Sequence, residues 1–203
     1  MKLLTFAVML LTLGLGAHAE AAEIVTNKTV GLEIVKPDGW QHLTAEANVA
    51  NLRAIEMEDK NLQKAIIKYG NAPVVAFTKY AEPYPDVNPS FKIGLRAAGQ
   101  LAGRDAKDVL AVVLPVLEKA LADVAVQEGP VETSVAGLPA AYVRLTYTMS
   151  AGGAQFPTTS EIWVVPRGSF FFLIGAGTRQ DEANGTRAEI RAILESMKID
   201  PQP

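Results

Sequence analysis

The chain contains no cysteine, which removes several classes of function at once. No disulfide bridge, thiolate metal site or cysteine nucleophile can form. A lipid-anchored bacterial lipoprotein is excluded as well, because its lipid is attached to a cysteine that follows the signal. Any chemistry must therefore come from other side chains.

Histidine is almost as scarce, with two in the chain, His18 and His42. A Ser-His-Asp triad would have to use His42, and no Gly-x-Ser-x-Gly elbow accompanies it. One histidine without cysteine cannot make a usual zinc site either. We therefore interpret His42 as a surface or capping residue. We predict no catalytic residue, no metal ligand and no cofactor, and thus a protein that is not an enzyme.

Two further patterns look like functional sites but have simpler explanations. Gly175-Ala176-Gly177 follows a strand, yet the third glycine of a dinucleotide fingerprint is replaced by Gln180 and no parallel β-α-β unit surrounds it. Glu161 lies beside an apolar hairpin, and we expect it to form a structural ion pair with Arg144 or Arg179 rather than to act as an acid.

The chain also has no strong excess of one charge. Without residues 1–19, which hold one lysine and no acid, 18 basic residues face 22 acidic ones. A mildly acidic protein is a poor match for the phosphates of nucleic acid, and no polybasic patch is available for an anionic membrane. Neither partner is expected.

The longest apolar run lies at the N-terminus. Residues 1–19 combine Lys2, an apolar stretch of about 13 residues and the small-residue site Ala17-His18-Ala19, the parts of a secretory signal. A bilayer span needs about 20 apolar residues, so we predict cleavage rather than a membrane anchor. Cleavage after Ala19 is our prediction, with Ala21 as the alternative. The mature protein, 20–203, is expected to be one soluble domain in a bacterial periplasm, or secreted.

The stretch 160–177 organises the rest of the chain. Two apolar runs flank Pro166-Arg167-Gly168-Ser169, which fits a type I turn with a glycine bulge. Both faces of each run are apolar, whereas a strand with one wet face would alternate. We therefore predict a β-hairpin covered on both sides.

The remaining segments supply strands and covering helices. Helical spacing predicts one long helix over 44–69 and a well-buried second helix that begins after Asp105. Thr186-Arg187-Ala188-Glu189 is a capping box that opens a third helix. Strands are predicted at 29–35, 73–80, 91–97, 131–135, 140–149 and, in short form, 197–199.

This order of elements predicts an α+β fold. Long consecutive strands joined by tight turns form an antiparallel sheet, and helices from both ends can cover its two faces. The expected architecture is a three-layer α/β/α sandwich with a central, mostly antiparallel sheet.

Three sequence features then resemble the PsbP-like superfamily, also called Mog/PsbP, with bacterial members of the DcrB type. They are an early strand running into Pro37-x-Gly39-Trp40, the segment Gly137-Leu138-Pro139-Ala140 before a long strand, and a final aromatic strand with a short helix ending 194–199. The resemblance spans about 24–200. It implies the sandwich fold and a mostly non-catalytic, partner-binding role, and it carries over no catalytic residue.

Two places could bind a partner. The segment 81–90 holds three prolines and presents Glu82, Tyr84 and Asp86, so it is a candidate partner-facing loop, with a plain connecting loop as the alternative. An apolar pocket between sheet and helix would be lined by four aromatic residues. These are Tyr147, Trp163, Phe170 and Phe172.

Three hypotheses of function follow. The first is an exported, non-enzymatic protein that binds another envelope component in an accessory or scaffold role. The second is a periplasmic carrier of a small apolar ligand, which a cavity of several hundred cubic ångströms would favour. The third is a hydrolase with an unrecognised site.

Overall fold

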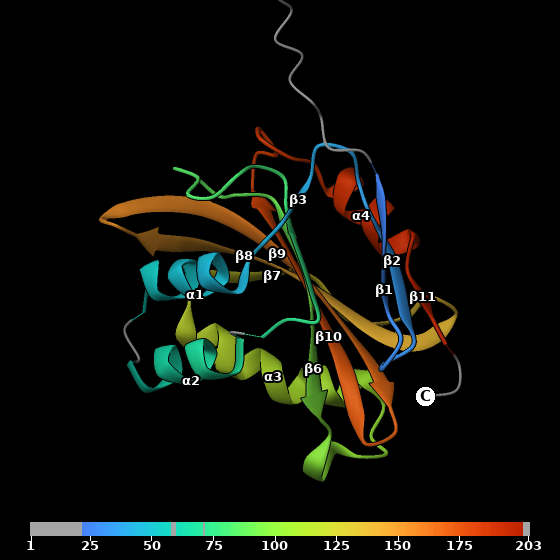
Figure 1. Cartoon of the computed structure of the whole chain (residues 1–203). Coiled ribbons are helices and arrows are strands. Elements are labelled where there is room, and N and C mark those ends of the chain that lie inside the picture. The colour runs from blue at the N-terminus through green and yellow to red at the C-terminus, as the bar shows by residue number, and fades with distance from the viewer. Residues whose placement is uncertain (1–21, 58–59, 71, 201–203) are drawn as a thin grey trace, which may run out of the picture.

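The computed structural model describes residues 22–57, 60–70 and 72–200, so the predicted signal peptide lies outside the described residues. Four α-helices and one short 3-10 helix cover a large and a small β-sheet (Figure 1). The helices are α1 Ala45–Ala54, α2 Lys60–Gly70, α3 Ala106–Ala120 and α4 Arg187–Glu195, with η1 at Gly99–Leu101. The strands are β1 Glu23–Asn27, β2 Leu32–Lys36, β3 Gln41–His42, β4 Ile55–Glu56, β5 Val75–Thr78, β6 Ser90–Ala97, β7 Ala122–Val135, β8 Leu138–Ala151, β9 Ala154–Arg167, β10 Phe170–Arg179 and β11 Lys198–Ile199.

The large sheet is antiparallel and is built around the predicted hairpin. Its order is β3-β5-β6-β10-β9-β8-β4, and β7 also pairs with β8. β9 and β10 are joined by the two residues Gly168 and Ser169, because Arg167 pairs with Phe170. Gly168 has a φ of 61° and Ser169 is not in the left-handed region, which matches a type II′ turn rather than the predicted type I turn with a bulge.

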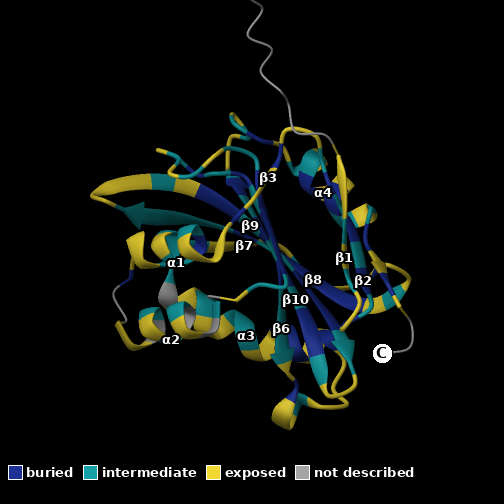
Figure 2. Ribbon diagram, viewed as in Figure 1, coloured by how far each residue is buried: buried dark blue, intermediate teal, exposed yellow. Residues whose placement is uncertain are grey.

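One face of this sheet packs against α4 and the small sheet β1-β2-β11. The core between them contains Phe172, Ile174 and Trp163 from the large sheet, with Ile190 and Ile193 from α4. Trp40 joins this core. The central strands are accordingly buried over most of their length (Figure 2).

The opposite face packs against α3. Phe171 from β10, Val143 and Leu145 from β8, and Val109 and Leu110 from α3 form this second core. Both faces of the hairpin are therefore covered, and the predicted α+β sandwich with its antiparallel sheet is confirmed. The small sheet beside α4 was not predicted.

Two predictions about helices are wrong. The segment 44–69 is not one helix: α1 starts at the predicted cap Thr44 and ends at Ala54, after which Ile55 and Glu56 pair with Ala151 and Ser150 of β8. α3 is also less buried than predicted, since Val112 and Val116 are 56% and 47% exposed. The helix buries one face only.

The last helix follows its sequence signals closely. Thr186 accepts a hydrogen bond from the backbone N–H of Glu189, and the Glu189 carboxylate accepts one from the backbone N–H of Thr186. This capping box was predicted, as was the short strand that follows, β11. Within the described part of the chain, no helix combines the length and the hydropathy that a membrane crossing requires.

Candidate ligand-binding cavity

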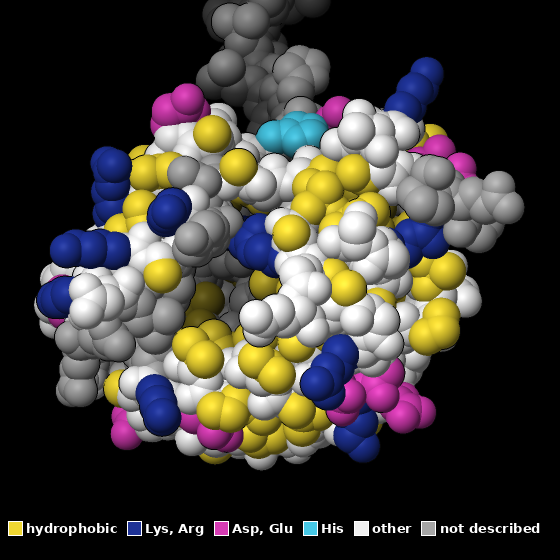
Figure 3. All heavy atoms as spheres, turned by 90° about the horizontal axis from the view of Figure 1, so that it is seen from below, with side chains coloured by type: hydrophobic (Ala, Val, Ile, Leu, Met, Phe, Trp, Pro, Cys, Tyr) yellow, Lys and Arg dark blue, Asp and Glu magenta, His cyan; other side chains and the backbone are white. Residues whose placement is uncertain are grey.

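A cavity of about 570 Å³ opens on the α3 side of the large sheet, beyond the end of α3. Its floor is made by β6, β8, β9 and β10, and its walls by α1 and the segment 82–88. Most of the lining is apolar, with a small number of polar side chains. Volume and lining are those of a small-molecule site. The surface on the side of α2 and α3 is visibly hollowed (Figure 3).

Two glycines of β10 leave the floor of the cavity without side chains at their positions. Gly175 and Gly177 face it from the middle of a strand, where glycine weakens a sheet and often marks the close approach of a ligand. A Cβ on Gly175 would meet no atom within 4 Å, and one on Gly177 would touch only Ser90 Oγ at 3.5 Å. Packing therefore does not exclude a side chain at either position, and the two glycines leave open space above the strand.

Lys92 places a cation at one end of the cavity. It is half-buried on β6, and its Nζ donates a hydrogen bond to Asn48 Oδ1 at 2.9 Å. Asn48 of α1 is fully buried and donates to the carbonyl oxygen of Gly70 at 2.9 Å. Loss of hydration lowers the pKa of Lys92, and the nearby Glu82 carboxylate only partly opposes this shift.

Glu82 holds the segment 82–88 in place. Its Oε1 accepts hydrogen bonds from the side-chain amides of Asn51 and Asn88, each at 2.9 Å, and its Oε2 accepts from the backbone N–H of Tyr84. The Tyr84 ring stacks on Tyr80 with centroids 4.6 Å apart. These contacts tie the segment to α1 and to Tyr80, which follows β5.

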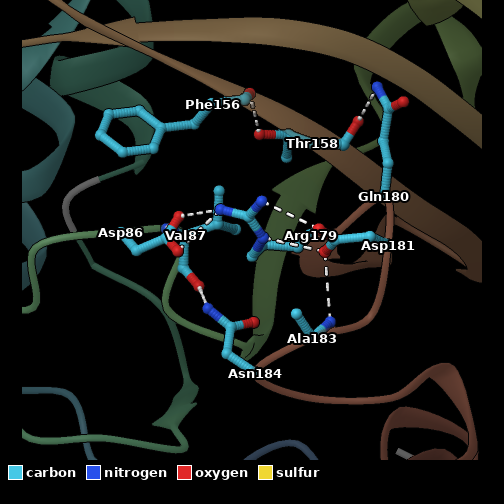
Figure 4. Close-up of polar contacts among 9 residues, drawn as sticks. All are labelled: Asp86, Val87, Phe156, Thr158, Arg179, Gln180, Asp181, Ala183 and Asn184. Carbon is cyan, nitrogen blue, oxygen red and sulfur yellow. Dashed lines mark hydrogen bonds and ion pairs between the residues drawn. The ribbon is translucent and has the colours of Figure 1, made fainter.

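Arg179 at the end of β10 holds the same segment from the other side (Figure 4). Its guanidinium donates to Asp86 and to Asp181 at 2.8–2.9 Å. Hydrogen bonds from the Arg179 guanidinium, and then from the backbone N–H of Ala183, lower the pKa of Asp181 to about 2. Asn184 adds a hydrogen bond to the carbonyl of Val87 at 2.7 Å.

A smaller cavity of about 160 Å³ adjoins the first, between the end of α3 and β4. The lining that it does not share comes from Met57, Leu117, Leu121 and Leu145. The two cavities share Ile55, Tyr147, Met149, Ser160 and Ile162. Tyr147 and Ser160 form a hydrogen-bonded pair at 3.2 Å at this boundary, and burial raises the pKa of Tyr147.

The structure brings together residues that the sequence analysis had assigned to two different sites. Glu82, Tyr84, Asp86 and Tyr147 all line the larger cavity. The first three are engaged in contacts within the protein, so their predicted role in meeting a partner remains a prediction.

The other three predicted pocket residues lie elsewhere. Phe172, Trp163 and the half-buried Phe170 belong to the core under α4, on the opposite face of the sheet. The reason is that side chains alternate between the two faces of a strand. Ser160 of β9 lies on the same face as Tyr147, whereas Trp163, three residues further along β9, lies on the opposite face. These side chains fill their own core and do not line the cavity.

Glu161 is buried as predicted, but its partner is neither Arg144 nor Arg179. Its carboxylate accepts hydrogen bonds from Arg187 Nε at 2.9 Å and from the Tyr142 hydroxyl. Burial, and then Glu161, raise the pKa of Tyr142 to about 12. This cluster joins the first residue of α4 to the sheet. Arg144 instead pairs with Glu128, and Arg179 with the two aspartates described above.

His42 lies on the surface. Its Nε2 is 3.0 Å from Glu23 Oε2, and its ring meets the edge of Phe77 at 5.4 Å. In the described ranges, no group of three or more histidine, aspartate or glutamate side chains is placed to hold a metal ion.

Comparison with known proteins finds similar solved structures but no matching family. No family model matches the chain, and no curated protein matches it. Among solved structures, LpqN, a protein involved in cell envelope biogenesis of Mycobacterium tuberculosis, matches with a TM-score of 0.53 and 17% identity over 89% of this chain and 91% of that one. The PsbP protein of the cyanobacterium Synechocystis, CyanoP, matches with a TM-score of 0.48 and 12% identity over 92% and 96%. PA94, a Pseudomonas aeruginosa protein of unknown function, matches with a TM-score of 0.47 and 15% identity over 90% of this chain and 98% of that one.

CyanoP, a PsbP protein, is among these matches. The TM-score of LpqN is the one above 0.5 among these three, and at 17% identity it shows a shared fold and nothing further. The site must be argued from this chain's own residues.

Proposed function

We propose that this protein is an exported, non-enzymatic binding protein of the cell envelope, and that its cavity holds a small, largely apolar ligand. The observation that carries the proposal is the cavity of about 570 Å³ above Gly175 and Gly177, with an apolar lining and a few fixed polar groups. Export is supported by the signal pattern of residues 1–19. The structural similarity to LpqN, a protein involved in cell envelope biogenesis, is compatible with that setting.

Filling the cavity from its floor tests the proposal. Gly175→Phe places a ring in the open space above β10, while Gly175→Ala adds a single methyl group there. We expect the neutral fluorescent probe N-phenyl-1-naphthylamine to bind the wild type and Gly175→Ala with similar affinity. Its affinity for Gly175→Phe should be lower by about tenfold or more. Absence of probe binding to the wild type would contradict the proposal.

The fold itself provides the control for this experiment. Both substitutions place a side chain on a strand position whose φ is not in the left-handed region, so each should raise the unfolding temperature or leave it unchanged. Weaker binding by a variant that is at least as stable as the wild type can then be attributed to the cavity.

A protein partner in the envelope is the second candidate. Val112 and Val116 expose apolar surface on α3, the feature that favours it. Capture from a periplasmic extract with the wild type should recover one reproducible protein, and Val112→Glu should recover less of it. Recovery of the same protein in equal amounts by both would exclude α3 as the contact.

A further inference from the structure

The two adjoining cavities differ in chemistry, and the difference suggests the kind of ligand. The larger one is lined at one end by Lys92, whose ammonium donates to the buried Asn48 behind it. The smaller one adds the aliphatic side chains of Leu117 and Leu121. The two cavities share five lining residues, Tyr147 and Ile162 among them, so an elongated molecule that passes these side chains would occupy both. Such a molecule would be polar at one end and apolar at the other.

The charges around the larger cavity define the polar end. Among the described residues of its lining, Lys92 is the single cation, and Glu82, Asp86 and Glu161 are the carboxylates. Asp86 is neutralised by Arg179, and Glu161 by Arg187. Glu82 accepts three hydrogen bonds from amide groups of the protein.

The charge of Lys92 is incompletely compensated. Its ammonium makes one direct hydrogen bond, to the neutral Asn48, and it has three N–H bonds to donate. The attraction of Glu82 does not offset the loss of hydration, so the lysine's pKa stays below its usual value. A negative group within hydrogen-bond distance of Nζ would supply the missing compensation.

We infer that the cavity binds a single-chain amphiphile with an anionic head group, the head at Lys92 and the chain directed past Tyr147 toward Leu117 and Leu121. This inference rests on the proposed function, because it assigns the chemistry of the ligand that the cavity is proposed to hold. The head group could be the carboxylate of a free fatty acid or the phosphate of a single-chain lipid.

Displacement of bound N-phenyl-1-naphthylamine by four twelve-carbon compounds, used below their micellar concentrations, tests the head group. The compounds are dodecanoate, dodecyl phosphate, dodecan-1-ol and dodecyltrimethylammonium. We expect the better anion to displace the probe at a concentration about tenfold lower than the alcohol, and the ammonium compound to be weaker than the alcohol. The stronger of the two anions identifies a fatty acid or a phosphate head. Equal potency of all four would overturn the inference.

Lys92→Met keeps the length of the side chain and removes the cation. In this variant the anions should lose their advantage, while dodecan-1-ol should bind as it does to the wild type. Lys107→Met, at an exposed position of α3, is the matched control and should keep the preference for anions. Equal loss of all four compounds in Lys92→Met would show that Lys92 only supports the fold, and would overturn the inference.

Leu117→Trp tests the direction of the chain. A larger side chain in the smaller cavity should shift the preferred ligand from dodecanoate toward octanoate. An unchanged preference would contradict the placement of the chain. The proposed function fails separately, if the wild type binds no probe at all; the present inference fails if the probe binds but acid and alcohol displace it equally.

Discussion

At the scale of single residues, the buried Tyr142–Glu161–Arg187 cluster is the most demanding feature of the molecule. The Glu161 side chain is 3% exposed and that of Arg187 23% exposed. A carboxylate so deeply buried needs its partner, because an uncompensated charge in a core is costly. The cluster therefore holds the start of α4 against the large sheet.

Removing the cation should expose this dependence. We expect Arg187→Met to lower the free energy of unfolding by about 3 kcal/mol, the lower end for a broken buried pair because Arg187 keeps some contact with water. The double variant Glu161→Gln/Arg187→Met should lose less than the single variant. Urea unfolding measures the free energy of unfolding of the two variants. Arg191→Met, on the exposed side of α4, is the control and should stay within about 0.5 kcal/mol of the wild type. An equal loss of stability in Arg187→Met and in the double variant would contradict the argument.

The second residue-scale prediction concerns acid. Asp181 has a pKa of about 2 in the folded protein, below the ordinary value of 3.8. Its stabilising contribution is therefore complete above the unfolded pKa and is lost as the pH falls through the folded one. Between about pH 5 and pH 2, the wild type should lose more stability in urea unfolding than Asp181→Asn does.

The exposed position of Asp181 limits the size of this effect. Its side chain is 55% exposed, so added salt should shrink the difference between the two proteins. Asp38→Asn, in an exposed turn, should lose stability with acid as the wild type does. A pH dependence that is identical in Asp181→Asn and the wild type would refute the prediction.

At the scale of elements, α3 contains its own destabilising residue. The helix continues past Pro115, where the proline removes one backbone N–H and crowds the carbonyl of Ala111 one turn earlier. Pro115 is exposed and fills no core. The helix tolerates it because Val109 and Leu110 bury the opposite face.

Replacing this proline should stabilise the protein. Pro115→Ala restores the missing N–H and relieves the clash, so we expect the free energy of unfolding to rise by about 1–3 kcal/mol. Thermal and urea unfolding both report it. Val112→Ala, one turn away and also exposed, should change stability by no more than about 0.5 kcal/mol. A destabilised Pro115→Ala would mean that α3 needs the proline for its packing.

At the scale of the whole molecule, one sheet separates two cores. Ile193 belongs to the core under α4 and Leu110 to the core under α3, and each is 1% exposed. Neither core is complete without the sheet, because the strands supply side chains to both. The layers should therefore unfold together even though their cores do not touch.

Paired core variants test this cooperativity. Ile193→Ala and Leu110→Ala should each cost about 2–5 kcal/mol, and the double variant should cost their sum within about 0.5 kcal/mol. Fluorescence and circular dichroism should follow a single coincident transition for each protein. Two separate transitions, or a double variant far from the sum, would show that the layers behave as independent units.

Much of this architecture was predictable from the sequence. The run 170–174 is apolar at consecutive positions, and a strand without a polar face must be covered twice. Thr44, Asp105 and Thr186 each accept a backbone hydrogen bond at the start of a helix, as their types and positions indicate. Each of these signals depends only on residues that lie within a few positions of one another in the sequence.

The break between α1 and α2 was not predictable in the same way. Helical spacing continues across 44–69, but Ile55 and Glu56 find strand partners in Ala151 and Ser150, almost one hundred residues later. Pairing with β8 overrides the local preference. A polar alternation at Ser90, Lys92 and Arg96 did mark a face of β6 that is not core, although nothing local said that a cavity lies above it.

The sequence by itself determined the covered hairpin, the antiparallel large sheet and the starts of α1, α3 and α4, because periodicity and capping act between neighbours in the chain. Tertiary structure alone decided the cavity. Lys92, Glu82, Tyr147 and Gly175 come from four separate segments, and a shift of any strand by one residue would turn its side chain to the other face. The register of the sheet and the packing of α1 and the segment 82–88 against it bring these residues around one space.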